Sequence, residues 1–240
     1  ARAPNLRVVA RPGIGIDTIN LADCTTAGVL VTNTPDAPSE STAEHAVTLL
    51  MAVARKLVQA DQGMRTLGWR SRDGLQGIEM RGKTLALVGL GRIGGRVAHI
   101  MGQGMGMRVL AWDPYVGPER GAALGIEMKP TLGEALAEAD AVSLHVPLTA
   151  ETRRLIGTRE LALMKPGSIL VNCARGPVVD EAALYDALAS GHLWGAGLDV
   201  FEREPQVHPA LLARSNAVLA PHLGSADLPT RVAMGRLAAE

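Results

Sequence analysis

Short apolar runs alternate with helix-like stretches through most of the chain. From Lys83 onward, continuous apolar runs predict buried strands at 84–88, 108–112, 141–146, 168–173 and 195–200, and a weaker one at 217–220. Helices are expected between them at about 92–104, 132–138 and 181–190, with a short one near 152–156. Uninterrupted apolar strands that alternate with helices indicate a parallel sheet covered on both faces. The pattern therefore predicts an α/β protein built on a doubly wound parallel sheet.

The residues before this sheet carry a shorter version of the same pattern. Strands are predicted at 6–10 and 29–32. The helix expected at 20–27 ends at Gly28, because glycine is typical of the position just after a helix. We interpret 63–82, which is rich in glycine and charged residues, as loop and linker.

Two capping boxes mark helix starts. In this motif a Ser or Thr side chain and a Glu three residues later satisfy free N–H groups at the first turn. Ser41 with Glu44 predicts the start of a long amphipathic helix, and Thr131 with Glu134 predicts the start of the 132–138 helix.

The composition excludes several classes of function. Hydrophobic residues make up 47% of the 240 residues but aromatic residues only 2%, which predicts an aliphatic, alanine-rich core and disfavours base stacking on aromatic rings. The formal net charge is zero, so a strongly basic surface for nucleic acid or membranes is not expected. No apolar run reaches the roughly 20 residues of a membrane span, and we expect no signal peptide.

The two cysteines, Cys24 and Cys173, lack the spacing of a zinc site or a disulfide framework. We therefore expect no metal site, and a location in the reducing cytoplasm.

The segment from Gly89 to Gly94 has the pattern G-x-G-x-x-G and directly follows a predicted strand. Gly89 permits a tight turn, Gly91 lets backbone N–H groups approach a pyrophosphate, and Gly94 permits close packing of helix and strand. The helix N-terminus adds partial positive charge and free N–H donors. Asp113 ends the next predicted strand, where it can accept hydrogen bonds from ribose hydroxyls and repel a 2′-phosphate. These features predict NAD in preference to NADP. The alternative is a glycine-rich turn beside a surface aspartate.

Four polar residues follow the later strands, on the sheet edge that carries the glycine-rich turn. Arg175 can hold a carboxylate in a bidentate manner and polarise a neighbouring ketone. Hydride transfer to a ketone leaves an alkoxide, and His222 can donate a proton to that alkoxide. Glu204 would fix the tautomer of His222 and favour its protonated form. Asp199 could orient the nicotinamide carboxamide. This chemistry suits hydride transfer to a 2-keto acid, although each residue alone is compatible with a solvated charge or a loop cap.

Several motifs in order resemble the D-isomer-specific 2-hydroxyacid dehydrogenases, the family that includes phosphoglycerate dehydrogenase and the hydroxypyruvate and glyoxylate reductases. The resemblance covers nearly the whole chain. Its motifs are RPGIGID at 11–17, NTP at 33–35, TAEH at 42–45, GLGRIG at 89–94, HVPLT at 145–149, MKPG at 164–167, NCARG at 172–176, DVF at 199–201, EP at 204–205 and PHLGS at 221–225.

The resemblance assigns roles to individual residues. The family's catalytic arginine, glutamate and histidine correspond to Arg175, Glu204 and His222. Ile14 and Gly15 would present backbone N–H groups to the substrate carboxylate, alongside Arg175 and His222. A glutamate beside the histidine, rather than a glutamine, argues against formate as the substrate. The implied NAD site comprises Gly89, Gly91, Arg92, Ile93, Gly94, Asp113, Val146, Pro147, Thr152, Cys173, Ala174, Arg175, Asp199, His222 and Gly224.

The resemblance also implies a division into domains. Residues 1–76 would be a remnant of a flavodoxin-like substrate domain with a linking helix, 77–226 the NAD-binding Rossmann domain, and 227–240 the start of a C-terminal crossover helix. The family's usual segments before Arg11 and after the crossover helix are not in the sequence. We therefore expect a fragment or a shortened chain.

The expected partner is a small 2-keto or 2-hydroxy acid, whose identity the strand-end residues do not specify. Met51 and Val53 are interpreted as lying on the outward face of the helix that starts at Ser41. They are compatible with a homodimer contact, as in the family, or with packing against another lobe. Because some family members serve as NAD-sensing transcriptional corepressors, a binding protein of that kind is the alternative function.

Overall fold

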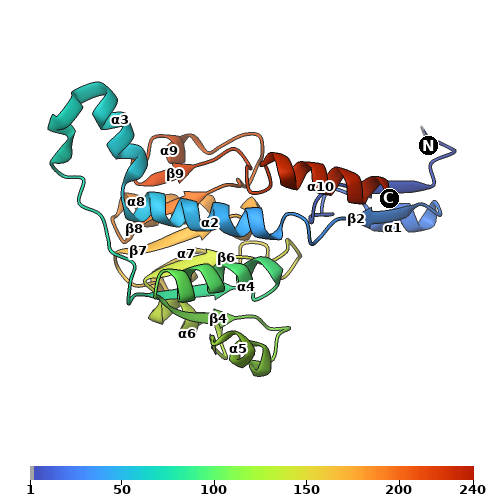
Figure 1. The fold of residues 1–240 in the computed structure, drawn as a ribbon, viewed down its shortest axis with the longest axis horizontal. Coiled ribbons are helices and arrows are strands. Elements are labelled where there is room, and N and C mark those ends of the chain that lie inside the picture. Colours follow the sequence, from blue (N-terminus) through green and yellow to red (C-terminus); the bar gives the residue numbers. More distant parts are fainter. Residues whose placement is uncertain (1–2) are drawn as a thin grey trace.

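The computed structural model describes residues 3–240. Its centre is a seven-stranded parallel sheet with the order β5-β4-β3-β6-β7-β8-β9 (Figure 1). The chain moves outward from β3 in one direction and then from β6 in the other, which is the doubly wound arrangement that the sequence predicts. The strands are β3 (Thr84–Val88), β4 (Arg108–Trp112), β5 (Glu127–Met128), β6 (Ala141–Leu144), β7 (Ser168–Asn172), β8 (Leu193–Leu198) and β9 (Ala217–Leu219).

Helices cover both faces of this sheet, and each face has its own core. One face is covered by α2 (Ser39–Ala54) and by α4 (Arg92–His99), which continues as the π-helical turn Ile100–Gly104. The largest fully buried side chains are Leu, Ile and Met, as the low aromatic content predicts. On the opposite face lie α6 (Leu132–Glu138), α7 (Thr158–Leu163) and α8 (Glu181–Ala189), and the shorter α5 (Pro118–Leu124) and α9 (Pro209–Leu212) belong to connections between strands.

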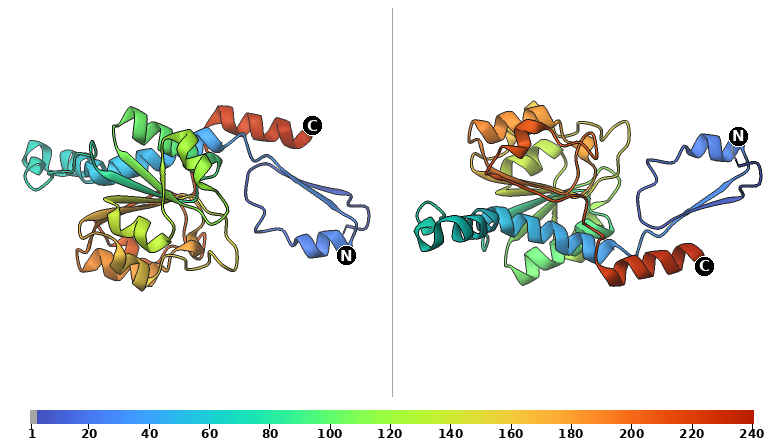
Figure 2. Two further views of the ribbon diagram at one scale, coloured as in Figure 1. Left: turned by 90° about the horizontal axis from the view of Figure 1, so that it is seen from below. Right: turned by 90° about the horizontal axis from the view of Figure 1, so that it is seen from above.

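A small lobe precedes the main sheet. Its two strands, β1 (Val8–Arg11) and β2 (Leu30–Asn33), are parallel and are joined through α1 (Leu21–Thr26). Figure 2 shows this lobe to one side of the sheet, with the last helix, α10 (Leu228–Ala239), extending toward it. Helix α10 contacts β1, and it begins at the boundary expected for the crossover helix.

An arm projects from the end of the molecule opposite the small lobe (Figure 1). It consists of α3 (Leu57–Leu67) and the 3-10 helix η1 (Gly68–Arg72). Lys56, whose φ of 50° lies in the left-handed region, separates α3 from α2. The prediction that 63–82 is loop and linker is therefore wrong for its first part, which is helical through Arg72.

The first capping box is also wrong, and the second is confirmed only for its threonine, since the Glu134 carboxylate accepts from the Thr131 hydroxyl and not from its backbone N–H. Helix α2 begins at Ser39, and the Ser41 hydroxyl donates instead to the Gly224 carbonyl at 2.9 Å. At α6 the Thr131 hydroxyl accepts from the Glu134 N–H at 3.2 Å, as expected.

Two further predictions are wrong. Residues 151–154 form a turn rather than part of a short helix, and the helix of this region, α7, starts later. Val53 is only 4% exposed and belongs to the core, and Met51 packs against that core, so neither marks an outward apolar face.

Candidate active site

The predicted site residues follow the carboxyl ends of five strands of the seven-stranded sheet. The glycine-rich turn follows β3, Asp113 follows β4, Arg175 lies past β7, Asp199 follows β8 and His222 lies past β9. Because the strands are parallel, all these residues lie at one edge of the sheet. This is the edge at which open α/β sheets bind ligands.

The glycine-rich turn fits a dinucleotide. Gly89 adopts a φ of 98°, and a Cβ at Gly94 would collide with the Gly89 carbonyl oxygen, so both positions require glycine. A Cβ at Gly91 would meet no protein atom within 4 Å. Gly91 is the N-cap of α4, whose first N–H groups lack intrahelical acceptors. The open space in front of these donors is suited to a pyrophosphate.

Asp113 lies directly against this turn. Its carboxylate accepts hydrogen bonds from the backbone N–H groups of Leu90 and Tyr115, both at 2.9 Å. The contact to Leu90 places the acidic group next to the glycine-rich turn, as a ribose-binding residue requires.

The other residues expected around the cofactor have mixed surroundings. Arg92 forms an ion pair with Asp36, and Ile93 packs partly buried against the core. After β6, the Thr152 hydroxyl donates to the Pro147 carbonyl at 2.6 Å and closes that loop. Val146 packs partly buried against the core on the α6–α8 face, and Cys173 and Ala174 are buried at the end of β7. Burial, followed by the nearby Asp199 charge, raises the pKa of Cys173, so this thiol stays protonated.

Arg175 reaches from the main sheet to the small lobe. Its Nε donates to Asp17 Oδ1 at 2.9 Å, and one terminal nitrogen donates to the Ala174 carbonyl at 2.7 Å. A Cβ at Gly15 would overlap the guanidinium, so the loop predicted to hold the substrate carboxylate lies against this arginine. Gly15 thus lies next to Arg175, and the binding of a carboxylate by the N–H groups of Ile14 and Gly15 stays a prediction.

Polar contacts shape that loop. The Asn33 side-chain amide donates to the Ile14 carbonyl at 2.9 Å, and Arg11 Nε donates to the Gly15 carbonyl at 3.2 Å. With these carbonyls engaged by side chains, the loop is tied back to β1 and β2.

His222 and Glu204 form a pair. His222 Nδ1 lies 3.0 Å from Glu204 Oε2, and Glu204 Oε1 accepts from the Phe201 N–H at 3.1 Å. The side chains are 49% and 38% exposed, so a small substrate can reach the imidazole. The Phe201 carbonyl also lies where a Cβ at Gly176 would be, which brings the loop after β8 against the turn that carries Arg175.

Asp199 holds the His222 loop. Its carboxylate is only 1% exposed and accepts from the N–H groups of Leu223 at 2.7 Å and Gly224 at 2.8 Å. His45 Nε2 lies 3.0 Å from the same carboxylate. His222 itself has a φ of 57°, an unusual value for this residue type that such contacts can maintain. The predicted contact of Asp199 with the nicotinamide stays a prediction.

Sequence reasoning missed three residues at this edge. Asp17 and His45 lie in quoted motifs but received no role, and their partners are more than 150 positions away in the chain. His145 follows β6, and its Nε2 lies 2.9 Å from the Ser143 hydroxyl. Burial lowers the pKa of His145 to about 4, so the imidazole is neutral at pH 7.

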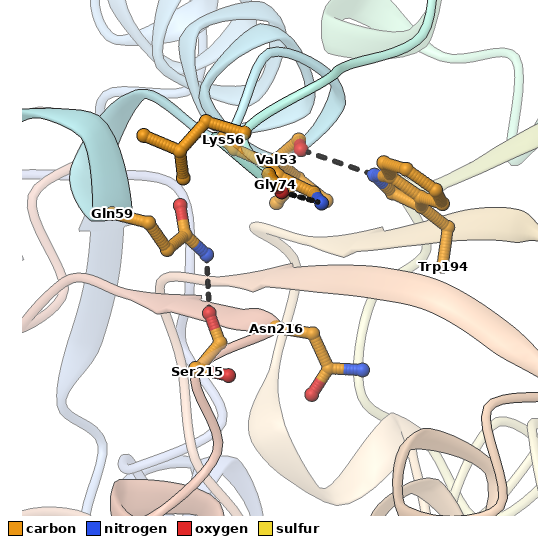
Figure 3. A pocket seen from close by; sticks show the side chains of 8 residues that line it. Val53, Lys56, Gln59, Gly74, Trp194, Ser215 and Asn216 are labelled. Carbon is orange, nitrogen blue, oxygen red and sulfur yellow. Dashed lines mark hydrogen bonds between the residues drawn. The ribbon is translucent and has the colours of Figure 1, made fainter. Parts of the chain in front are cut away.

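A pocket of about 340 Å³ lies elsewhere, between α2, α3 and the amino ends of β8 and β9 (Figure 3). The Lys56 ammonium lies 4.8 Å from the centroid of the Trp194 ring and donates to the Gly74 carbonyl at 3.1 Å. Since it opens at the amino ends of the strands, this pocket is on the opposite edge of the sheet from His222. Its position does not suit the predicted reaction.

No group of three or more His, Cys, Asp or Glu side chains among residues 3–240 is arranged to hold a metal ion. No helix in that range is both long and apolar enough to cross a membrane.

The chain is similar in sequence and fold to known proteins. Residues 47–224 match the family model described as "D-isomer specific 2-hydroxyacid dehydrogenase, NAD binding domain". A D-3-phosphoglycerate dehydrogenase of Mycobacterium tuberculosis is 46% identical over 240 residues, which are 100% of this chain and 45% of that protein. A glyoxylate reductase of Thermococcus gammatolerans is 47% identical over 244 residues, covering 99% of this chain and 72% of that protein. The crystal structure of the TT0316 protein from Thermus thermophilus has a TM-score of 0.92 at 43% identity, covering 100% of this chain and 75% of that one.

The chain belongs to the D-isomer-specific 2-hydroxyacid dehydrogenase family, and residues 47–224 match that family's NAD-binding domain. The family resemblance and the fold predicted from the sequence are thereby confirmed. The chain spans 45% of the length of the phosphoglycerate dehydrogenase described above.

Proposed function

We propose that the protein is an NAD-dependent oxidoreductase that interconverts a small 2-keto acid and a D-2-hydroxy acid. The observation that carries the proposal is the position of Arg175 and the His222–Glu204 pair on the strand edge that holds the glycine-rich turn. The family membership supports the cofactor and the reaction type.

The proposed NAD site is the glycine-rich turn with Asp113 beside it. Bound NADH supplies the hydride that reduces the ketone, and bound NAD accepts it in the reverse direction. The chain contributes the N–H groups at the start of α4 for the pyrophosphate and the Asp113 carboxylate for the adenosine ribose. That carboxylate would repel a 2′-phosphate, which favours NAD.

The proposed substrate site is completed by the small lobe. Arg175 binds the substrate carboxylate and polarises the ketone, and the N–H groups of Ile14 and Gly15 face the same carboxylate. These interactions place the carbonyl carbon for attack and stabilise the negative charge that develops on its oxygen.

His222 is the proposed general acid. With its Nδ1–H directed at Glu204, a protonated His222 gives the Nε2 proton to the alkoxide oxygen, and in the oxidative direction the neutral ring takes that proton back. Glu204 favours the protonated ring by its charge and fixes the tautomer by its hydrogen bond. Each turnover therefore moves one hydride and one proton.

Hydroxypyruvate, glyoxylate and 3-phosphohydroxypyruvate are the candidate substrates, because the relatives are named as glyoxylate reductase and D-3-phosphoglycerate dehydrogenase. Those names give no support to the corepressor alternative. We further propose a cytoplasmic protein and the domain limits 1–76, 77–226 and 227–240 expected from the resemblance.

A homodimer is proposed through the arm. Leu67 and Trp69 are 65% and 75% exposed there, and Leu57 and Met64 are also exposed. A second copy would cover these apolar side chains. Light scattering on the native protein and on Trp69→Ser tests this: loss of the dimer in the variant is expected, and a monomeric native protein contradicts it.

The direct test of the function is NADH oxidation by the full-length protein with each candidate keto acid. Reduction of at least one, lost in Arg175→Lys, is expected because a point charge cannot replace the bidentate fork. NADH binding should persist in the variant. If Arg175→Lys reduces every keto acid as well as the native protein, the proposed function is wrong.

A further inference from the structure

The guanidinium of Arg175 has two edges, and the structure uses them differently. The Nε edge donates to Asp17 Oδ1 at 2.9 Å. One terminal nitrogen donates to the Ala174 carbonyl at 2.7 Å. A guanidinium carries five N–H groups in a fixed fork. Among residues 3–240, no acceptor takes the N–H groups of the second terminal nitrogen or the other N–H of the first.

The second terminal nitrogen of Arg175 lies against Gly15. A Cβ at Gly15 would overlap the second terminal nitrogen of Arg175, and the φ of Gly15 is not in the left-handed region. The glycine is therefore required for space rather than for backbone conformation. The gap it leaves is occupied by the guanidinium.

Asp17 contributes a negative charge to Arg175 as well as a hydrogen bond. Its side chain is 28% exposed and that of Arg175 is 25% exposed, so the pair is partly shielded from water. Burial by itself raises the pKa of Asp17, but the hydrogen bond and charge of Arg175, together with a backbone hydrogen bond and the charge of Arg11, outweigh it and hold that pKa below its usual value. The carboxylate is consequently ionised throughout the pH range in which enzymes are assayed.

Resting on the proposed function, we propose that Asp17 is a positioning residue for Arg175. It occupies the Nε edge, fixes the plane of the guanidinium across the gap between the small lobe and the main sheet, and directs the terminal edge toward the substrate carboxylate. The connection joins positions 158 residues apart, so it also ties the loop of Ile14 and Gly15 to β7.

The contact geometry favours positioning over competition. Either edge of a guanidinium can form two parallel N–H···O bonds with a carboxylate. Asp17 takes the Nε edge, which leaves the terminal edge for the substrate. The substrate and Asp17 can therefore bind Arg175 together.

The test compares Asp17→Ala and Asp17→Asn in the full-length protein. We expect Asp17→Ala to raise the KM for the keto acid about tenfold, the effect of losing one charge-assisted hydrogen bond. Asp17→Asn keeps an acceptor oxygen and should raise it only about threefold. The KM for NADH should not change in either variant, and kcat should change less than the keto-acid KM. The binding constant of oxamate, an unreactive analogue of a 2-keto acid, should weaken in parallel with that KM.

Glu40→Ala is the matched control, because it removes another arginine–carboxylate pair outside the site. Glu40 accepts from Arg96 at 2.5 and 2.7 Å. We expect this variant to keep the native keto-acid KM within about twofold, since exposed ion pairs contribute little. Thermal unfolding of all variants identifies any that fail to fold. If Asp17→Ala fails to fold, the test rests on Asp17→Asn, which keeps the size of the side chain.

Three outcomes overturn the inference. An unchanged keto-acid KM in Asp17→Ala shows that Asp17 does not orient Arg175, and a lowered KM shows that it competes with the substrate. An equal rise in Glu40→Ala shows a general structural effect. Arg175→Lys distinguishes a failure of this inference from a failure of the proposed function. If Arg175→Lys loses keto-acid reduction while Asp17→Ala does not, only the role of Asp17 is wrong.

Discussion

The main sheet and the small lobe contribute to the candidate site in different ways. Every residue of β3, β6 and β7 is buried, whereas three of the four residues in each of β1 and β2 are exposed. The sheet places its side chains through an extensive core on both faces. The small lobe places Ile14, Gly15 and Asp17 through a few polar contacts. We therefore expect substitutions in the sheet to lower the stability of the fold, and substitutions in the lobe to weaken substrate binding.

The largest effect is expected for a residue of the strand edge itself. His222→Asn removes the proposed general acid and should lower kcat for keto-acid reduction on the order of a thousandfold. Because His222 is half exposed and outside the core, the melting temperature should barely change. Steady-state kinetics with NADH and calorimetry check both statements. A variant with native kcat would remove His222 from the mechanism.

Gly15→Ala tests the lobe. The new Cβ would collide with the Arg175 guanidinium and displace it. We expect kcat/KM for the keto acid to fall on the order of a hundredfold, as misplaced binding groups do. The NADH KM should stay native, because the atoms nearest to a Cβ at Gly15 belong to Arg175 and Asp17 and not to the glycine-rich turn. A loss confined to NADH binding would contradict the assignment.

Gly91→Ala is the counterpart in the cofactor site. Its Cβ would meet no protein atom within 4 Å, so the variant should fold normally. The side chain would instead occupy the space proposed for the pyrophosphate and raise the NADH KM about tenfold, which is the loss of one charge-assisted hydrogen bond. Native NADH binding in this variant would argue that the dinucleotide does not lie there.

Gly197→Ala tests the sheet. A Cβ at this β8 position would lie 2.9 Å from Leu49 Cβ on α2, so the helix must shift. Overpacking of this kind costs about 3 kcal/mol of unfolding free energy. Denaturant unfolding measures the loss, and the folded fraction should keep its native keto-acid KM. If the keto-acid KM changes and the stability does not, the main sheet and the small lobe do not differ in the way proposed.

The smallest effect concerns pH. His145 has a pKa of about 4 in the folded protein, and the unfolded chain titrates near 6.5. Between these values the unfolded state binds more protons, so stability falls as the pH falls through this window. Part of this side chain keeps contact with solvent. The expected contribution is therefore up to about 2 kcal/mol, lost progressively toward pH 4.

Urea unfolding across that pH window measures this dependence. His145→Gln should flatten it, because the group that titrates is gone. If the variant keeps the native pH dependence, the loss of stability has another source.

The sequence predicts the parts of the fold that depend on local pattern. Strands β3 and β4 match their expected limits, because both are continuous apolar runs with sharp ends. The start of α2 is missed because the Ser41 hydroxyl, which the local motif assigns to a cap, bonds to Gly224, far along the chain. The break at Lys56 is missed because lysine carries no preference for the left-handed conformation it adopts.

The candidate site likewise contains residues that the sequence pattern predicts and residues that it does not. Arg175, Asp199 and His222 were found because each directly follows an apolar strand, and strand order places them at one edge. The sequence pattern does not identify Asp17 and His45, because their partners are distant in the sequence and residue spacing does not reveal such contacts. The family resemblance supplied Ile14 and Gly15, which no local pattern singles out.

The most direct test of the account is a crystal structure of the full-length protein with NADH and oxamate. The carboxylate of oxamate should bind the terminal nitrogens of Arg175 and the N–H groups of Ile14 and Gly15, with its carbonyl oxygen beside His222 Nε2. Oxamate bound away from this edge, for instance in the pocket of Figure 3, or His222 and Arg175 facing away from a common ligand, would contradict it.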